Sequence, residues 1–156
     1  MGKDGVTRFG EGVDVGDRWF DGNAIQPLFP FGYRLSYTQL TYQDVKVAKA
    51  ADGGMDFSFS VHNTGRCDSD EVPQVYLAAP QTSRAQAAFA VHALAGFTRL
   101  HIAAGATDSV SVHVSPRSLQ YWSVVSKGWE TAHGQRELLV GGSSRDLPLH
   151  AIIEAP

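Results

Sequence analysis

The sequence predicts an all-β protein: an antiparallel β-sandwich of about seven strands that follows an extended N-terminal segment. Three observations support this prediction. Apolar and polar residues alternate over several short stretches, which is typical of strands with one buried face. Turn-forming residues separate these stretches at short intervals, as in a sandwich and unlike a parallel α/β sheet. No window sustains the apolar spacing of an amphipathic helix.

The first 37 residues differ from the rest of the chain. Residues 1–24 are rich in glycine without a sustained period, and residues 25–33 contain two prolines, which keep the backbone extended and remove hydrogen-bond donors. So many large apolar side chains are not typical of a solvated tail. We therefore expect residues 1–37 to form an extended interdomain or linker segment, and residues 38–156 to form the sandwich. The residues expected to contact another domain are Trp19, Phe20, Leu28, Phe29, Phe31 and Tyr33.

The strands are expected in seven stretches. The clearest alternation runs from Met55 to Val61, and the turn residues Asn63-Thr64-Gly65 end it. Gly141-Gly142-Ser143-Ser144 is expected to form a hairpin turn, and residues 81–90 a loop. The expected strands lie near residues 42–49, 55–61, 72–79, 94–102, 110–114, 135–141 and 147–153.

Composition excludes several classes of function. The chain has 156 residues and a formal net charge of −3, so it has no electrostatic reason to bind nucleic acid or an anionic membrane. No stretch approaches the roughly 20 apolar residues of a membrane span, and the N-terminus has no apolar signal-peptide core. Cys67 is the one cysteine and cannot form an internal disulfide.

No group of residues forms a recognisable catalytic or metal site. Asp68, Asp70 and Glu71 could form an acid/base pair or a calcium loop, but they lack regular ligand spacing, which favours a solvated turn. The six histidines show no helical pair and are expected at the surface. Gly-x-Ser-x-Gly and glycine-rich nucleotide motifs do not occur. We therefore expect no catalytic residues, no metal and no cofactor.

Trp122 and Trp129 are the remaining candidates for a functional role. Both precede the expected strand at 135–141, and a buried sandwich tryptophan is the common case, so packing in the core is favoured. The alternative is that the two rings stack on sugar rings.

Several motifs resemble the fibronectin type III-like domain of glycoside hydrolase family 3. Residues 28–38 are similar to the family's "PLFPFGYGLSYT" signature, and residues 11–21 to its "EGIFVGYRYYD" stretch. Three departures from the pattern are Arg34 in place of glycine, Asp17 in place of an aromatic residue, and Ser123 in place of aspartate. Further matches are Val61-His62-Asn63-Thr64-Gly65, Glu71 to Leu77, Leu94 to Leu100, Leu119 with Trp122 and Trp129, and Gly134 with Val140 to Asp146.

The resemblance implies an immunoglobulin- or fibronectin type III-like sandwich without catalytic residues. In this family the nucleophile lies in an N-terminal barrel domain, and an α/β-sandwich domain commonly supplies the acid/base. The resemblance therefore implies an accessory domain that packs on both domains of a β-glucosidase- or β-xylosidase-like parent, which is secreted or periplasmic. We expect the N-terminal segment to mediate self-association when it is uncovered. The alternative function is a module that binds plant polysaccharide or lignin through exposed aromatic side chains.

Overall fold

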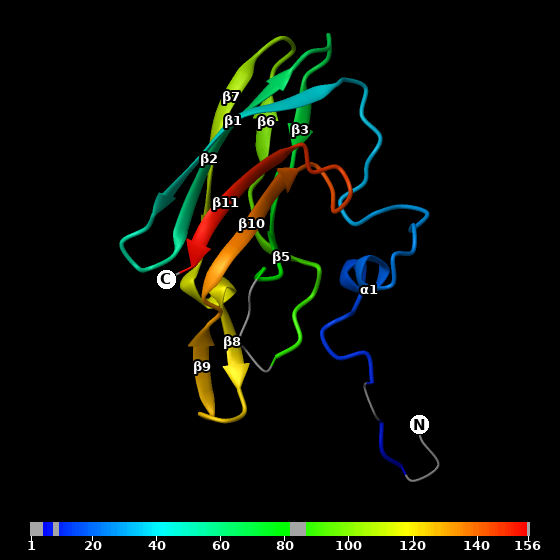
Figure 1. Ribbon diagram of the computed structural model, residues 1–156. Coiled ribbons are helices and arrows are strands. Elements are labelled where there is room, and N and C mark those ends of the chain that lie inside the picture. Colours follow the sequence, from blue (N-terminus) through cyan, green and yellow to red (C-terminus); the bar gives the residue numbers. More distant parts are fainter. Residues whose placement is uncertain (1–4, 8–9, 82–86, 156) are drawn as a thin grey trace.

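The computed structural model describes residues 5–7, 10–81 and 87–155 and is a sandwich of two antiparallel sheets (Figure 1). One sheet has the strand order β1-β2-β7 and the other β11-β10-β4-β5, and the short pairs β3–β6 and β8–β9 complete the fold. The strands are β1 (Leu40–Lys49), β2 (Met55–Asn63), β3 (Ser69–Glu71), β4 (Gln74–Ala78), β5 (His92–Phe97), β6 (Leu100–Ile102), β7 (Thr107–Val114), β8 (Gln120–Ser123), β9 (Gly128–Thr131), β10 (Gly134–Gly141) and β11 (Leu149–Ala155), and the helices are α1 (Asp17–Gly22) and the 3-10 turn η1 (Pro116–Leu119).

The predicted antiparallel sandwich is confirmed, but the expected count of about seven strands is too low, because the short strands β3, β6, β8 and β9 were not expected as separate elements. The seven strands of the two main sheets correspond to the seven expected stretches, but the single strand expected over 94–102 is wrong. It divides into β5, which pairs with β4, and β6, which pairs with β3. The segment that pairs with these strands is interrupted at the matching place by Pro73, which lies between β3 and β4 and has no N–H to continue the ladder. The carbonyl of Pro73 accepts a hydrogen bond from Thr98 N–H at 3.2 Å.

The core lies between the two main sheets. On β2 the expected alternation places Phe57 and Phe59 inward, and their cross-strand partners on β7 are Val112 and Val110. Leu138 faces them from β10 in the same buried cluster. Each of these side chains contributes about 1.5–3 kcal/mol through removal of its apolar surface from water. Burial between the sheets therefore holds the sandwich together.

A short helix, α1, interrupts the N-terminal segment, where no helix was expected. Gly16 precedes it with a φ of 65°, and the side chain of Asn23 donates to the carbonyl of Trp19 at 2.8 Å where it ends. Six residues cannot hold a helix by propensity alone, so contacts with the sandwich, described below, stabilise α1. Residues 25–33 contain no helix, as the prolines predict.

The Asn-Thr-Gly turn after β2 is built around Asn63, whose side chain is fully buried. Its amide N–H groups donate to the carbonyls of Cys67 (2.8 Å) and Ile102 (3.2 Å). Its side-chain oxygen accepts from the backbone N–H of Gly65 (3.1 Å) and from the hydroxyl of Thr38. A Cβ atom at Gly65 would lie 2.0 Å from that hydroxyl oxygen, so the position requires glycine. Asn63 therefore joins the end of β2, β6 and the N-terminal segment.

Two carboxylates hold the imidazole of His113 on β7. Nδ1 lies 2.7 Å from Asp56, its cross-strand partner, and Nε2 lies 3.1 Å from Asp52 in the β1–β2 turn. Because a carboxylate only accepts hydrogen bonds, both ring nitrogens donate and the imidazole is positively charged. The hydrogen bond with Asp56, together with the charge of Asp52, raises the pKa of His113.

We expect this arrangement to make stability depend on pH. A raised folded-state pKa means that the contribution of His113 is complete below the ordinary histidine value of about 6.5 and is lost as pH rises through the folded-state value. Urea unfolding at pH 6 and at pH 8.5 checks this for the unmodified chain and for His113→Gln. The stability difference between them is expected to shrink at pH 8.5; an equal difference at both pH values would contradict the prediction.

Other sequence expectations have mixed outcomes. Across the described ranges, no helix is long and apolar enough to span a membrane. Nor does any group of three or more histidine, cysteine or acidic side chains in those ranges have a geometry suited to a metal ion. The hairpin turn expected at 141–144 joins the antiparallel neighbours β10 and β11. The loop expected at 81–90 falls largely on residues 82–86, which lie outside the described residues.

Candidate functional site

The N-terminal segment, which includes α1, runs along one side of the sandwich (Figure 1). The anchor of α1 is Asp21, whose side chain is almost fully buried. Its carboxylate pairs with Arg145 from the β10–β11 connection at 2.8 Å and with His92 of β5 at 3.4 Å. Arg145 also donates to the carbonyl of Ile25 at 3.1 Å. Polar contacts therefore fix the first part of the segment to both the edge strand and the loop.

The middle of the segment is fixed through its backbone. The carbonyl of Phe31 accepts a hydrogen bond from Ser144 N–H at 2.8 Å, and Tyr33 N–H closes a turn onto Pro30 at 2.9 Å. Gly32 in this turn has a φ of 84°, and a Cβ atom there would lie 2.0 Å from the side-chain amide of Gln74. The glycine thus permits both the turn and the close approach to β4.

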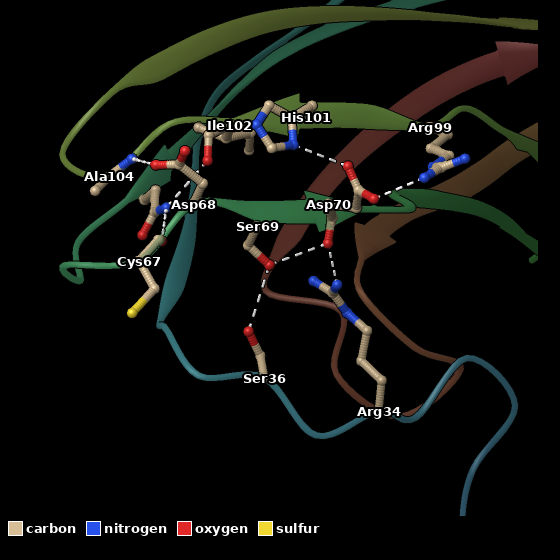
Figure 2. Close-up of polar contacts among 11 residues, drawn as sticks. Arg34, Ser36, Cys67, Asp68, Ser69, Asp70, Arg99, His101, Ile102 and Ala104 are labelled. Atoms are coloured by element: carbon tan, nitrogen blue, oxygen red, sulfur yellow. Dashed lines mark hydrogen bonds and ion pairs between the residues drawn. The ribbon is translucent and has the colours of Figure 1, made fainter.

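Residues 33–38 alternate between polar and apolar side chains, but the polar side chains face the sandwich, which is the reverse of an ordinary surface strand. Three polar side chains point toward the sandwich: Arg34 toward β3 and Ser36 toward Ser69 (3.4 Å between hydroxyls), as Figure 2 shows, and Thr38 toward Asn63. The apolar side chains between them point away, with Leu35 88% exposed and Tyr37 99% exposed. The polar residues face the protein and the apolar residues face solvent.

Arg34 makes the strongest of these contacts. Its guanidinium donates to the backbone carbonyl of Asp70 and to the carboxylate of Glu71. The Glu71 side chain is only 4% exposed, and its other oxygen accepts from Val72 N–H at 3.0 Å. The expected solvated turn at residues 68–71 is therefore wrong for Glu71, which lies in β3 and is buried because Arg34 neutralises it.

Asp70, the neighbour of Glu71, is half exposed and belongs to a polar cluster on the surface (Figure 2). Arg99 donates to one carboxylate oxygen at 2.6 Å, and His101 lies 3.0 Å from the other. The hydrogen bonds from Arg99 and then His101 hold the pKa of Asp70 below its usual range. The carboxylate is thus engaged by both Arg99 and His101.

The outward side chains of residues 28–37 make up a surface that we call the apolar strip. Four of its members were expected to contact another domain, and the structure leaves all four exposed. Sequence reasoning missed Leu35 and Tyr37, although the period-2 alternation of residues 33–38 carried the signal. The members and their exposed fractions are Leu28 (87%), Phe29 (67%), Phe31 (57%), Tyr33 (49%), Leu35 (88%) and Tyr37 (99%).

The two other residues expected to contact another domain lie in α1, at the end of the apolar strip. Trp19 is 40% exposed, whereas Phe20 is half-buried, and their rings meet edge to face at 5.3 Å. Phe20, Phe29 and Phe31 help to line a hollow of about 250 Å³ between α1 and the strip. Its lining is mainly apolar and also includes Asp17 and Arg145.

A second, polar hollow of about 250 Å³ lies beside the strip and contains the hydroxyl of Tyr42. This hydroxyl is buried and has no hydrogen-bond partner among the described residues. A Cβ atom at Gly142 would lie 3.4 Å from it and 3.5 Å from Glu71. Burial raises the pKa of Tyr42, so the phenol stays neutral. The phenol of Tyr42 and the carboxylate of Glu71 therefore both lie beside Gly142.

Trp122 and Trp129 do not lie in the core, so the favoured sequence interpretation is wrong. They are cross-strand partners on the β8–β9 hairpin, and each is 50% exposed. The hairpin extends from one end of the sandwich, away from the space between the sheets (Figure 1). No strand was expected over residues 120–131, and local periodicity does not reveal that a strand pair projects beyond the core.

Solved structures of β-glucosidases share this fold. The β-glucosidase DesR from Streptomyces venezuelae, solved in complex with D-glucose, is 39% identical, with a TM-score of 0.89 over 94% of this chain and 18% of that chain. A glycoside hydrolase family 3 β-glucosidase from Bifidobacterium adolescentis is 32% identical, with a TM-score of 0.85 over 93% of this chain and 21% of that chain.

Curated relatives point to the same enzymes. Probable β-glucosidase D from Aspergillus niger is 36% identical over 91% of this chain and 21% of its own length. Exo-α-(1→6)-L-arabinopyranosidase from Bifidobacterium breve is 36% identical over 94% of this chain and 19% of its own length. The chain therefore spans about a fifth of the length of the curated relatives it matches.

The sequence model of the fibronectin type III-like domain matches residues 71–144. Residues 71–144 therefore belong to the fibronectin type III-like family, and the chain as a whole is similar to this part of glycoside hydrolase family 3 enzymes. The resemblance seen in the sequence motifs is thereby confirmed, and with it the expected sandwich.

The three departures of this fibronectin type III-like domain from the family pattern have local explanations. Arg34, in place of glycine, turns inward and pairs with Glu71. Asp17, in place of an aromatic residue, begins α1. The hydroxyl of Ser123 accepts a hydrogen bond from Ser126 N–H at 3.3 Å in the β8–β9 turn. Only the first departure adds a contact between the N-terminal segment and the sandwich.

Proposed function

We propose that this fibronectin type III-like domain is a non-catalytic accessory domain of a glycoside hydrolase family 3 enzyme, and that its apolar strip packs on the catalytic domains. The observation that carries the proposal is the inverted alternation of residues 33–38. Polar anchors hold the strip in place while its apolar side chains face solvent. A surface of this kind is favourable only when a partner covers it.

Energetics support the apolar strip as a docking surface. Covering one of its leucine or phenylalanine side chains contributes about 1.5–3 kcal/mol before the costs of association. The anchors reduce the cost of ordering, because the backbone of the segment is already fixed at Asp21, Phe31 and Arg34. The partner therefore meets a preformed surface.

We expect the isolated chain to hydrolyse no glycoside. Three acidic residues beside the N-terminal segment have structural partners: Asp21 pairs with Arg145, Glu71 with Arg34, and Asp70 with Arg99. An assay on an aryl β-glucoside checks this expectation, and turnover that copurifies with the chain would overturn it. The parent enzyme that we propose is β-glucosidase-like, in keeping with the names of the relatives.

A chimera tests the docking of the strip. The matching region of the β-glucosidase from Streptomyces venezuelae is replaced by this chain, which has 39% sequence identity to that enzyme. We expect the chimera to fold and hydrolyse an aryl glucoside, and we expect Phe29→Asp with Leu35→Asp to lower its melting temperature by several degrees. The reason is that two carboxylates would be placed in an apolar interface.

The matched control is Val124→Asp with Val125→Asp, which places the same charges on exposed valines of the β8–β9 turn. In the isolated chain neither pair of changes is expected to alter the midpoint of urea unfolding by much, since all four side chains are largely exposed. Equal effects of the two pairs in the chimera would refute docking through the strip. Light scattering on the isolated chain provides a second measurement: we expect self-association that the strip substitutions abolish.

A further inference from the structure

The β8–β9 hairpin carries a second surface, which is separate from the apolar strip. Its two faces differ because cross-strand partners share a face. Tyr121 and Glu130 occupy one face, where the hydroxyl of Tyr121 donates to Glu130 at 2.7 Å and its ring packs against Phe89. Trp122 and Trp129 occupy the other face, which solvent reaches.

The two tryptophan rings form a corner and not a flat platform. Their centroids lie 5.6 Å apart and their planes are inclined by 77°. A flat polymer surface such as crystalline cellulose needs coplanar rings, so it does not match this geometry. A corner of two half-exposed rings instead accommodates a single ring that stacks on one indole and contacts the edge of the other.

Arg117 of η1 adds a positive charge to this corner. Its guanidinium carbon lies 4.0 Å from the centroid of the Trp129 ring, a cation–π arrangement. No hydrogen bond or ion pair to this guanidinium is formed by any residue in the described ranges. Stacking uses the face of the guanidinium and leaves its N–H groups free at the edge, where they match the geometry of a carboxylate.

The charge around the corner favours an anion. Residues 115–136 contain three cations (Arg117, Lys127 and Arg136) and one anion (Glu130), whereas the whole chain has a net charge of −3. Arg136 is buried and donates to the carbonyl of Ala78, so Arg117 and Lys127 are the accessible charges. Glu130 is directed to the opposite face by Tyr121.

We propose that the corner formed by Trp122, Trp129 and Arg117 binds a uronic acid residue of an acidic polysaccharide. An exposed indole face stacks on the pyranose ring, and the free N–H groups of Arg117 form paired hydrogen bonds with the sugar carboxylate. The site sharpens the polysaccharide-binding alternative from general stacking to recognition of charge. It does not depend on docking of the apolar strip, which lies on different elements.

Calorimetric titration of the chain with polygalacturonate tests the proposal, with fully methyl-esterified polygalacturonate and poly-L-glutamate as comparison ligands. We expect binding to polygalacturonate and at least about tenfold weaker binding to each of the others, because one lacks the charge and the other lacks the ring. Arg117→Gln and Trp122→Ala are each expected to weaken polygalacturonate binding by about tenfold or more.

Two matched variants serve as controls. Arg66→Gln removes an exposed charge elsewhere, and Val124→Ala shortens an exposed side chain of the same hairpin; both are expected to bind as the unmodified chain does. Circular dichroism and the midpoint of urea unfolding show whether Trp122→Ala leaves the sandwich intact. Arg117→Lys, which keeps the charge but loses the paired geometry, is expected to bind with intermediate affinity. Absence of binding to polygalacturonate, or equal binding to either comparison ligand, would overturn the proposal.

Discussion

Replacing Asn63 by alanine is expected to lower the free energy of unfolding by about 3 kcal/mol. The substitution removes four hydrogen bonds made by one fully buried side chain. It leaves the carbonyls of Cys67 and Ile102, the N–H of Gly65 and the hydroxyl of Thr38 without their partner. Urea unfolding monitored by circular dichroism measures the loss.

The neighbouring Thr64→Ala is the control for Asn63→Ala. Its hydroxyl makes one exposed hydrogen bond, to the carbonyl of Gln39 at 3.1 Å, and its loss is expected to cost less than about 1 kcal/mol. If Asn63→Ala were no more destabilising than Thr64→Ala, Asn63 would not be the joint between β2, β6 and the N-terminal segment. Limited proteolysis within residues 33–38 is a second measurement, since Asn63→Ala also releases Thr38.

Arg34→Ala is expected to cost about 2–3 kcal/mol. It leaves the carboxylate of Glu71 buried without a cation, a change that costs about 3–5 kcal/mol for a fully buried pair. The smaller figure reflects the exposure of Arg34, whose side chain is 35% accessible, so water compensates part of the loss. The same urea experiment measures it, and proteolysis of residues 33–38 is expected to accelerate.

A double-mutant cycle separates the ion pair from other effects of Arg34. Glu71→Gln removes the charge that Arg34 neutralises, so Arg34→Ala is expected to cost less in the Glu71→Gln background than in the unmodified chain. Additive costs in the double variant would show that the guanidinium stabilises the segment through Asp70 or through packing, and not through Glu71.

Much of the fold could be predicted from the sequence because apolar and polar residues alternate along the strands of a sandwich. The stretch from Met55 to Val61 is an example, since each buried residue is apolar and each residue between them is polar and at least partly exposed. The division of residues 94–102 could not be predicted in this way. The division depends on Pro73, which lies between the partner strands β3 and β4 and interrupts their pairing with β6 and β5.

The site was predictable only in part, because its decisive contacts join residues far apart in the sequence. The apolar residues of the strip could be identified, but the burial of Glu71 depends on Arg34, 37 residues earlier. The half-exposed position of Trp122 and Trp129 depends on where the hairpin projects from the sandwich, and local alternation carries no record of that.

The anchoring of α1 has a consequence for synthesis on the ribosome. The segment is translated before the sandwich, yet Arg145, which pairs with Asp21 and holds the carbonyl of Ile25, lies 120 residues after Ile25. The strip's outward leucine and aromatic side chains therefore stay untethered at this end until most of the sandwich has been translated. Chaperones that recognise apolar stretches have this interval in which to bind the strip.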